Sequence, residues 1–266
     1  MAKIGFIGMG NMGYALVRGL LSAFDEDDIM FSCSTDARRK SVSSKLGITA
    51  AMSNAELVQA CEIIVLAIKP QVYQEVFDEI APFVHQGSMI ISLAPGKSIS
   101  YITQALSGKV RVVRAMPNTP ALIGHGMTGI AYDESIFSAE DIDIIDKLFS
   151  SVGSYRKVDE EQMSAVVCAS GSSPAYVYMF IKELTDAVVK KGLPKETALD
   201  MVSNAVLGAA MMVLKTGEDP DVLKERVCSK GGTTIAGIGR LNEDGFAWAI
   251  HDATEACYIR SEELGK

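Results

Sequence analysis

A glycine-rich run near the N-terminus limits the chain to very few folds. It reads Gly8-Met9-Gly10-Asn11-Met12-Gly13, directly after an apolar strand candidate and at the start of a helix candidate. This G-x-G-x-x-G spacing, in that context, is typical of the first βα turn of a dinucleotide-binding domain. The first glycine allows a tight turn, the second lets backbone approach a pyrophosphate, and the third lets the helix pack on the strand. We therefore predict that these residues hold the phosphates of a nucleotide.

The first 158 residues continue as that motif requires, with short apolar runs alternating with amphipathic stretches. Such alternation predicts βαβ units and a parallel sheet. Strands are predicted at 3–7, 29–33, 63–68, 89–93 and 110–114, with weaker ones at 129–132 and 155–158, and helices at 11–23, 37–46, 72–83 and 138–149. We expect a Rossmann domain over residues 1–158.

The strand patterns stop at about residue 159. Val177, Ile181, Leu184 and Val188 recur at the spacing of one helical face, which predicts amphipathic helices. We expect an all-α domain over residues 159–266. Its alanine-rich helices can pack against each other or against a second subunit, and the second alternative is favoured.

Composition excludes several classes of function. A net charge of -8 without a basic stripe argues against a nucleic-acid partner. The five cysteines are widely spaced, so we predict no disulfide framework and no metal site, and a cytoplasmic location. The three histidines are predicted to be ordinary residues. No run approaches the ~20 apolar residues of a membrane span, so no membrane association is expected.

The ends of the predicted strands suggest how the nucleotide is recognised. After the second strand, Ser34 and Thr35 offer hydroxyls to a ribose 2′-phosphate, and either Arg38 or Arg39 can neutralise it, so NADPH is favoured while NADH stays possible. Asp36 is counter-evidence, although its place suits a helix N-cap. The third strand ends at Ala67-Ile68-Lys69-Pro70, where an ammonium can meet the cofactor.

Two further loops follow strands at the same edge of the sheet, where ligands of such folds bind. They are Ala94-Pro95-Gly96 and the run from Ala115 to Pro120, which includes Asn118. We predict that they wall a nicotinamide pocket.

Two stretches of the helical half have helix-start chemistry. Gly171-Ser172-Ser173-Pro174 is an ordinary start with proline in the first turn. Gly231-Gly232-Thr233-Thr234 also precedes a helix candidate, and the N–H groups at a helix N-terminus favour an anion. This turn is either a simple break between helices or a cradle for a small carboxylate.

Taken together, the motifs resemble one family. "GFIGMGNMG", "AIKP", "RAMPNTPA", "GSSPAYVYMFIKEL" and "CSKGGTTIAGI" occur in one order across the whole chain. The sequence is similar to the pyrroline-5-carboxylate reductases, which catalyse the last step of proline synthesis. The resemblance implies NAD(P)H-dependent reduction of 1-pyrroline-5-carboxylate to L-proline, a homodimer formed through the helical domain, and a larger homo-oligomer.

The resemblance also implies roles for single residues. Asn54 and Lys69 match cofactor contacts, and Ala94 falls on the nicotinamide loop. The substrate carboxylate falls on the backbone of residues 231–233, Thr234 is the catalytic residue whose hydroxyl reaches the ring nitrogen, and Glu160 matches a further substrate-side position. Lys230 and Pro95 depart from the family pattern.

Two other functions remain open on the sequence. A β-hydroxyacid dehydrogenase also joins a Rossmann domain to helices but needs a basic lysine on its first interdomain helix, and from 163 to 184 the chain has only Lys182, late in the stretch. A non-catalytic NADP-binding regulatory protein is the second alternative.

Overall fold

This computed structural model describes residues 4–265, so the predicted strand residue Lys3 lies outside it. By its internal contacts the chain divides into two units. Unit 1 is Met1–Pro174 together with Cys257–Lys266, and unit 2 is Ala175–Ala256. The boundary predicted after residue 158 follows strand β8, whereas the division by contacts comes after Pro174.

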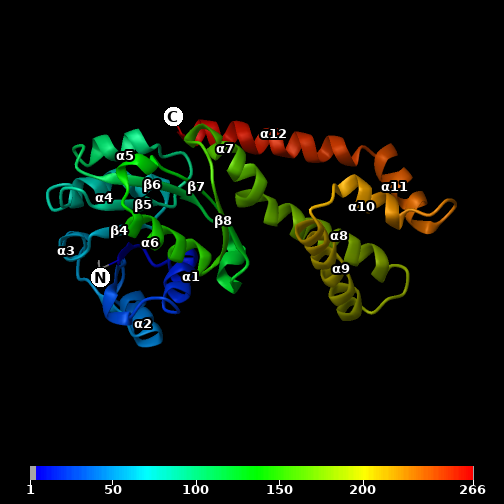
Figure 1. Cartoon of the computed structure of the whole chain (residues 1–266). Coiled ribbons are helices and arrows are strands. Elements are labelled where there is room, and N and C mark those ends of the chain that lie inside the picture. Colours follow the sequence, from blue (N-terminus) through cyan, green and yellow to red (C-terminus); the bar gives the residue numbers. More distant parts are fainter. Residues whose placement is uncertain (1–3, 266) are drawn as a thin grey trace. The chain divides into compact units, whose positions relative to one another are not determined.

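Unit 1 is built on an eight-stranded sheet in the order β3-β2-β1-β4-β5-β6-β7-β8 (Figure 1). Neighbouring strands are parallel except β6 and β7. The strands are β1 (Ile4–Ile7), β2 (Ile29–Ser32), β3 (Thr49–Ala50), β4 (Ile63–Leu66), β5 (Met89–Ser92), β6 (Arg111–Met116), β7 (Gly126–Ala131) and β8 (Gly153–Lys157). The predicted Rossmann architecture is confirmed.

Helices cover both faces of this sheet, which explains why the strands are continuous apolar runs. The helices of unit 1 are α1 (Asn11–Leu20), α2 (Asp36–Leu46), α3 (Asn54–Ala60), α4 (Tyr73–Ile80), α5 (Ile99–Ala105), α6 (Ala139–Ser150) and α7 (Met163–Val166). Successive residues of β4 alternate between two buried clusters. Val65 packs with α1 and α6, and Ile64 and Leu66 pack with α3, α4 and α5.

Four short strands and α-helices of unit 1 were not predicted: β3, α3, α5 and α7. The helices α3 and α5 are seven residues each and carry too few turns to show a periodic apolar face. Their starts are set by N-caps, since Ser53 accepts from the Glu56 N–H and Ser98 accepts from the Tyr101 N–H. The remaining predicted strands and helices of unit 1 are present with small differences in their bounds.

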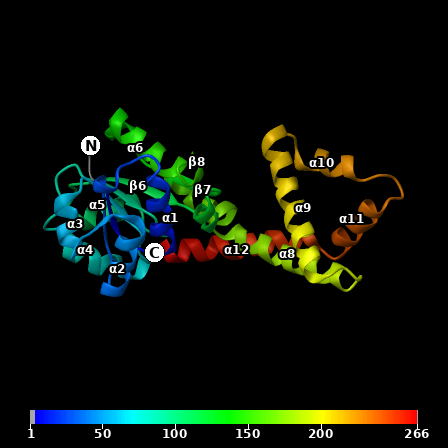
Figure 2. The same ribbon diagram turned by 90° about the horizontal axis from the view of Figure 1, so that it is seen from below.

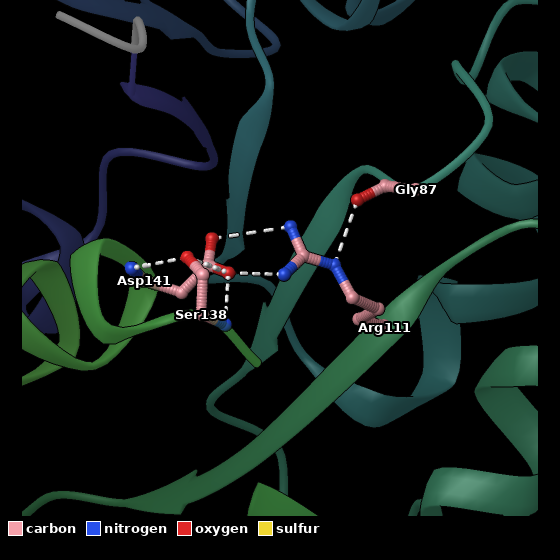
Figure 3. A network of polar contacts seen from close by, with 4 residues as sticks. All are labelled: Gly87, Arg111, Ser138 and Asp141. Carbon is pink, nitrogen blue, oxygen red and sulfur yellow. Dashed lines mark hydrogen bonds and ion pairs between the residues drawn. The ribbon is translucent and has the colours of Figure 1, made fainter. Parts of the chain in front are cut away.

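An arginine at the amino end of β6 ties α6 to the sheet (Figure 3). The Arg111 guanidinium pairs with both carboxylate oxygens of Asp141 and donates through Nε to the Gly87 carbonyl at 2.9 Å. Asp141 also forms a capping box with Ser138 at the start of α6. Burial alone would raise the pKa of Asp141, but hydrogen bonds from Arg111 and Ser138 outweigh it and hold the pKa below 3.8.

Replacing Asp141 with asparagine is expected to lower the free energy of unfolding by about 1.5–3 kcal/mol at neutral pH, the range for hydrogen bonds to charged groups. Because the folded pKa is depressed, this stabilisation is present above pH 3.8 and is lost as pH falls below it. Urea unfolding at several pH values measures it. Asp143→Asn is the control, since Asp143 pairs with Lys147 on the exposed face of the same helix. A difference between wild type and Asp141→Asn that persists undiminished well below pH 3.8 would contradict the assignment.

Unit 2 contains helices and no strand among its residues, as predicted (Figure 2). It comprises most of α8 (Ser173–Val189), all of α9 (Lys195–Thr216), α10 (Pro220–Val227) and α11 (Thr233–Glu243), and the first half of α12 (Phe246–Gly265). Large apolar side chains on these helices are exposed in the single chain, including Met179, Leu214 and Trp248 at 67%, 79% and 74%. Such a surface is typical of an interface with another protein chain.

The prediction that no segment approaches the length and apolar composition of a membrane span is wrong. The helical segments Glu160–Val189 and Lys195–Thr216 are both long and apolar enough to cross a membrane. Few of their apolar residues are buried within the single chain. An interface between subunits would cover the exposed apolar side chains of these helices as well as a lipid bilayer would.

The predicted helix start at Gly171-Ser172-Ser173-Pro174 is wrong in one respect. The chain is already helical before it, through α7 and a π-helical segment at Val167–Ser172. Pro174 has no N–H to donate to the Ser170 carbonyl one turn back. The side-chain amide of Asn118 donates to that carbonyl instead, at 3.0 Å, so the helix continues through the proline.

Candidate active site

A cleft of about 720 Å³ opens in unit 1 at the carboxyl ends of β1, β2 and β4. This edge is where doubly wound folds bind their ligands. The predicted cofactor residues that line it are Gly8, Gly10, Ser34, Thr35, Arg38, Asn54, Ala67 and Lys69. The cleft therefore gathers residues from loops that are far apart in sequence. Asn11, Met12, Gly13, Pro70, Ala94 and Asn118 are not among its lining residues.

The glycine-rich turn fits a pyrophosphate. Gly8 has a φ of +94°, and a Cβ on it would lie 2.6 Å from the Ala67 carbonyl oxygen. A Cβ on Gly13 would lie 2.5 Å from the Gly8 carbonyl oxygen. By contrast, a Cβ on Gly10 would meet nothing within 4 Å, so the turn is open beside the N-terminus of α1. No side chain caps that helix end, which leaves its N–H groups for an anion.

The two adjacent arginines of α2 have different surroundings. Arg38 donates through Nε to the Met9 carbonyl at 2.9 Å and lies over the Tyr14 ring, so it braces the glycine-rich turn. Arg39 lines the cleft, and its Nε is buried with no hydrogen-bond partner among the described residues. Its Nη1 lies 3.2 Å from a carboxylate oxygen of Asp36, which is 81% exposed.

The N-cap of α2 differs from the prediction. Thr35, not Asp36, is the N-cap, and its hydroxyl accepts from the Arg38 N–H at 3.3 Å. Asp36 is the first residue of the helix, which leaves its carboxylate free to pair with Arg39. Ser34 is exposed beside them.

Asn54 is fixed in the cleft by partners that the sequence did not reveal. Its Oδ1 accepts from the Ser32 hydroxyl at 2.6 Å, and its Nδ2 donates to Glu79 of α4 at 2.6 Å. The Glu79 carboxylate also accepts from the Asn54 N–H at 3.0 Å, at the start of α3. Lys69 is exposed at the rim of the cleft. Glu79 gave no signal in the sequence because it reads as one polar position of an amphipathic helix.

The loop after β5 lies over a buried tyrosine. The Tyr73 hydroxyl is 2.9 Å from the Ser92 hydroxyl and hydrogen-bonds the main chain of Ala94. Burial raises the pKa of Tyr73 to about 12, so the phenol stays protonated at neutral pH. Ala94 itself is buried.

Asn118 and Glu160 both make contacts within unit 1. Asn118 is 8% exposed, and besides the bond to Ser170 its Oδ1 accepts from the Met127 N–H at 2.9 Å. Its side chain therefore links the π-helical segment at Val167–Ser172 to strand β7. Glu160 accepts from the Ile99 N–H and from Arg114. Arg114 stands between apolar residues in the middle of β6, and that position was a signal the sequence analysis did not use.

The Gly231–Thr234 turn belongs to unit 2. Gly231 has a φ of +74°, which favours glycine, and Gly232 is the N-cap of α11 without a side-chain cap. The first N–H groups of α11 therefore have no capping side chain, and Thr233 and Thr234 are exposed. This geometry has the donors of an anion cradle.

Comparison with known proteins identifies the relatives of this chain. A family model for pyrroline-5-carboxylate reductase dimerisation matches residues 160–264. A model for NADP oxidoreductase, coenzyme F420-dependent, matches residues 3–96. The chain is 38% identical to the pyrroline-5-carboxylate reductase of Escherichia coli (strain K12), over 99% of this chain and 98% of the relative. The chain belongs to the pyrroline-5-carboxylate reductase family. The reductase of Arabidopsis thaliana is 36% identical over 99% of this chain and 96% of the relative.

Solved structures agree with this family. The pyrroline carboxylate reductase of Plasmodium falciparum, with NADP bound, matches with a TM-score of 0.90 and 30% identity over 100% of this chain and 98% of that one. The family enzyme of Coxiella burnetii matches with a TM-score of 0.91 and 31% identity, covering 100% and 99%. A 3-hydroxyisobutyrate dehydrogenase of Mycobacterium tuberculosis, at 16% identity and a TM-score of 0.56, covers 77% of this chain and 70% of that one and shares the fold alone.

Proposed function

We propose that the protein reduces 1-pyrroline-5-carboxylate to L-proline with NADPH. The observation that carries this proposal is the 38% identity with a pyrroline-5-carboxylate reductase along nearly the whole of both chains. The rival β-hydroxyacid dehydrogenase has only a shared fold in its favour, and a non-catalytic NADP-binding protein would not need the Gly231–Thr234 turn.

The cofactor is assigned to the cleft of unit 1. The pyrophosphate binds at Gly8, Gly10, Asn11, Met12 and Gly13, because the open side of Gly10 and the uncapped start of α1 offer N–H groups there. Asn54 and Lys69 contact the adenosine side, with Ala67 and Pro70 shaping the wall. The loops containing Ala94 and Asn118 flank the nicotinamide, and the Asn118 side chain holds its loop in place.

The substrate is assigned to the start of α11. Its carboxylate is assigned to the backbone of Gly231, Gly232 and Thr233, where the Gly232 N–H already donates to the Ser229 carbonyl at 3.0 Å. The Thr234 hydroxyl meets the ring nitrogen. NADPH, when bound, supplies the hydride. A protonated C=N bond accepts hydride at C5 readily, so the protein mainly has to position the reactants. Thr234 orients the iminium and holds its N–H proton, which the amine of proline keeps.

A spectrophotometric assay tests the function directly. Purified protein is mixed with 1-pyrroline-5-carboxylate, and the loss of reduced-nicotinamide absorbance is followed with NADPH and NADH in parallel. We expect turnover with both and a preference for NADPH. Absence of turnover from folded protein that binds NADPH would overturn the proposal.

Arg39 is the residue that we assign to the 2′-phosphate, with Ser34 and Thr35 beside it. Both arginines line the cleft. The unpartnered Nε of Arg39 favours it, because the Nε of Arg38 already donates to the Met9 carbonyl. Arg39→Met is expected to raise the KM for NADPH about 10- to 100-fold, the loss of charge-assisted hydrogen bonds. The KM for NADH should change less than about twofold, because NADH has no such phosphate.

Arg38→Met is the matched comparison. Arg38 braces the Met9 carbonyl in the glycine-rich turn, which both cofactors use, so this variant should weaken NADPH and NADH alike. Equal effects of Arg39→Met on both cofactors would contradict the phosphate assignment.

We also propose a cytoplasmic homodimer that assembles into a larger homo-oligomer. The exposed apolar faces of α8 and α9 fall within the segment matched by the dimerisation model. A second subunit covers these faces in preference to a membrane. Light scattering of the purified protein should give at least twice the 28.5 kDa of one chain, and a monomer mass would contradict this assignment.

A further inference from the structure

The loop between β5 and α5, residues 94–98, is anchored along its length. Near its start, the main chain of Ala94 hydrogen-bonds the Tyr73 hydroxyl. In its middle, Gly96 has a φ of +77° and lies against the last turn of α12, where a Cβ would be 2.5 Å from the Leu264 carbonyl oxygen. This part of α12 belongs to unit 1. The loop is therefore placed by packing before any cofactor binds.

The end of the loop is anchored by a carboxylate from elsewhere in unit 1. Ile99 is the first residue of α5, and its N–H donates to Oε1 of Glu160 at 2.7 Å. N–H groups in the first turn of a helix have no partner within the helix, and a negative charge is favourable there. Glu160 is 61 residues away in sequence, so this contact fixes the loop relative to the segment that leads into α7.

Glu160 is itself held by a nearly buried arginine. Nη1 of Arg114 lies 2.9 Å from the same Oε1, with the side chains of Arg114 and Glu160 12% and 30% exposed. Arg114 pairs in the sheet with Ser92, the last residue of β5. Its Nε is buried without a hydrogen-bond partner in the described part of the chain. Glu160 thus neutralises a guanidinium in a poorly solvated place, and neither side chain can move without disturbing the other.

We infer that Arg114 and Glu160 are a positioning pair for the reaction: through the Ile99 N–H they fix residues 94–98, and with them the nicotinamide of bound NADPH. In this role both residues act through the loop and not by contact with cofactor or substrate. The inference rests on the proposed function, which places the nicotinamide at this loop. It differs from the substrate-side role that the family resemblance implies for Glu160, because a substrate contact would appear in KM and a positioning contact in kcat.

The test compares Glu160→Ala and Arg114→Met with wild type. Both variants should lower kcat about 10- to 100-fold, since a displacement of about 1 Å can cost that much in hydride transfer. The KM for 1-pyrroline-5-carboxylate and the Kd for NADPH should each stay within about threefold. With NADPH deuterated at C4, the isotope effect on kcat should be larger in both variants, because hydride transfer becomes slower than the other steps. The double variant should be no worse than the poorer single one.

Glu161→Gln is the matched control. Glu161 lines the same pocket of about 550 Å³ as Glu160, but no contact joins it to Ile99 or Arg114 among the described residues. It should keep kcat within about twofold of wild type. Arg114→Lys, which keeps a cation beside Glu160, should recover part of the kcat lost in Arg114→Met. It also covers the case in which Arg114→Met fails to fold, which circular dichroism reports.

Three outcomes would overturn the inference. If Glu160→Ala raises the KM for 1-pyrroline-5-carboxylate at unchanged kcat, Glu160 contacts the substrate directly. If Arg114→Met and Glu160→Ala behave as wild type in kcat and isotope effect, the pair does not position the loop. The fluorescence of bound NADPH distinguishes failure of the inference from failure of the proposed function, because the measurement needs no substrate. Positioning predicts a changed nicotinamide emission in both variants even if wild type reduces another compound, and an unchanged emission would again overturn it.

Discussion

Replacing Thr234 with alanine is expected to lower kcat for 1-pyrroline-5-carboxylate by about 100-fold, the lower end of the range for loss of one group that hydrogen-bonds the reacting atoms in the transition state. The Kd for NADPH should stay within about twofold, because the Thr234 hydroxyl is assigned to the ring nitrogen of the substrate and not to the cofactor. Steady-state kinetics and a fluorescence titration with NADPH measure the two quantities. A loss in kcat without a loss in cofactor affinity is the signature of a group acting at the reacting atoms.

Two further substitutions separate the hydroxyl from the shape of the side chain. Thr234→Ser keeps the hydroxyl and should retain kcat within about fivefold, whereas Thr234→Val keeps the shape and should be as slow as alanine. All three variants change one side chain in the exposed first turn of α11, so the thermal melting temperature should change little. Equal kcat for the valine variant and wild type would remove the hydroxyl from the mechanism.

Substitutions of Gly8 and Gly10, the first two glycines of the glycine-rich turn, should have different effects: the first lowers stability and the second lowers cofactor affinity alone. Gly8→Ala puts a Cβ 2.6 Å from the Ala67 carbonyl oxygen at a φ of +94°. The left-handed backbone costs about 1–2 kcal/mol and the overpacking about 1–3 kcal/mol, so urea unfolding should show a loss of about 2–5 kcal/mol. NADPH binding should be lost with it. Gly10→Ala meets open space at a φ of -73° and should leave unfolding unchanged.

The affinity of Gly10→Ala for NADPH then tests whether the open space beside Gly10 holds the pyrophosphate. A methyl group there stands where the pyrophosphate must approach the backbone, so Gly10→Ala should weaken NADPH about 10- to 100-fold, a displaced set of charge-assisted hydrogen bonds. NADH should be weakened equally, because the pyrophosphate is common to both cofactors. Wild-type affinity in Gly10→Ala would place the phosphates elsewhere.

The fold could be predicted from the sequence where each strand is buried on both faces. Ile63–Leu66 is a continuous apolar run because α1 and α6 cover one face and α3, α4 and α5 cover the other. The helix α3 could not be predicted, because seven residues contain less than two full turns and its start depends on Glu79 from another helix. The continuous helix through Pro174 was missed for a similar reason, since the donor that permits it is Asn118.

The candidate site could be predicted where its residues are neighbours in one turn of the sequence. It could not be predicted where residues far apart in the sequence come into contact. The glycine spacing is local, and the left-handed Gly8 and the open Gly10 are what that spacing requires. Arg38 and Arg39 are neighbours of equal charge, and only their contacts in the folded chain distinguish them, Arg38 with Met9 and Arg39 with Asp36. Glu160 and Arg114 are 46 residues apart, so their pairing is a property of the folded sheet and not of either motif.

The bond from Asn118 to Ser170 has a consequence for the order in which the chain can fold. The donor is made 52 residues before the carbonyl that it serves, so a growing chain can have the Met116–Asn118 loop in place when the helix arrives. A fragment beginning at residue 160, the start of the matched dimerisation segment, would contain Pro174 without Asn118. The helical turns of this fragment before Pro174 would be unstable, because the Ser170 carbonyl would lack its donor. The dimerisation segment therefore needs Asn118 of the nucleotide-binding domain to form its first helix completely.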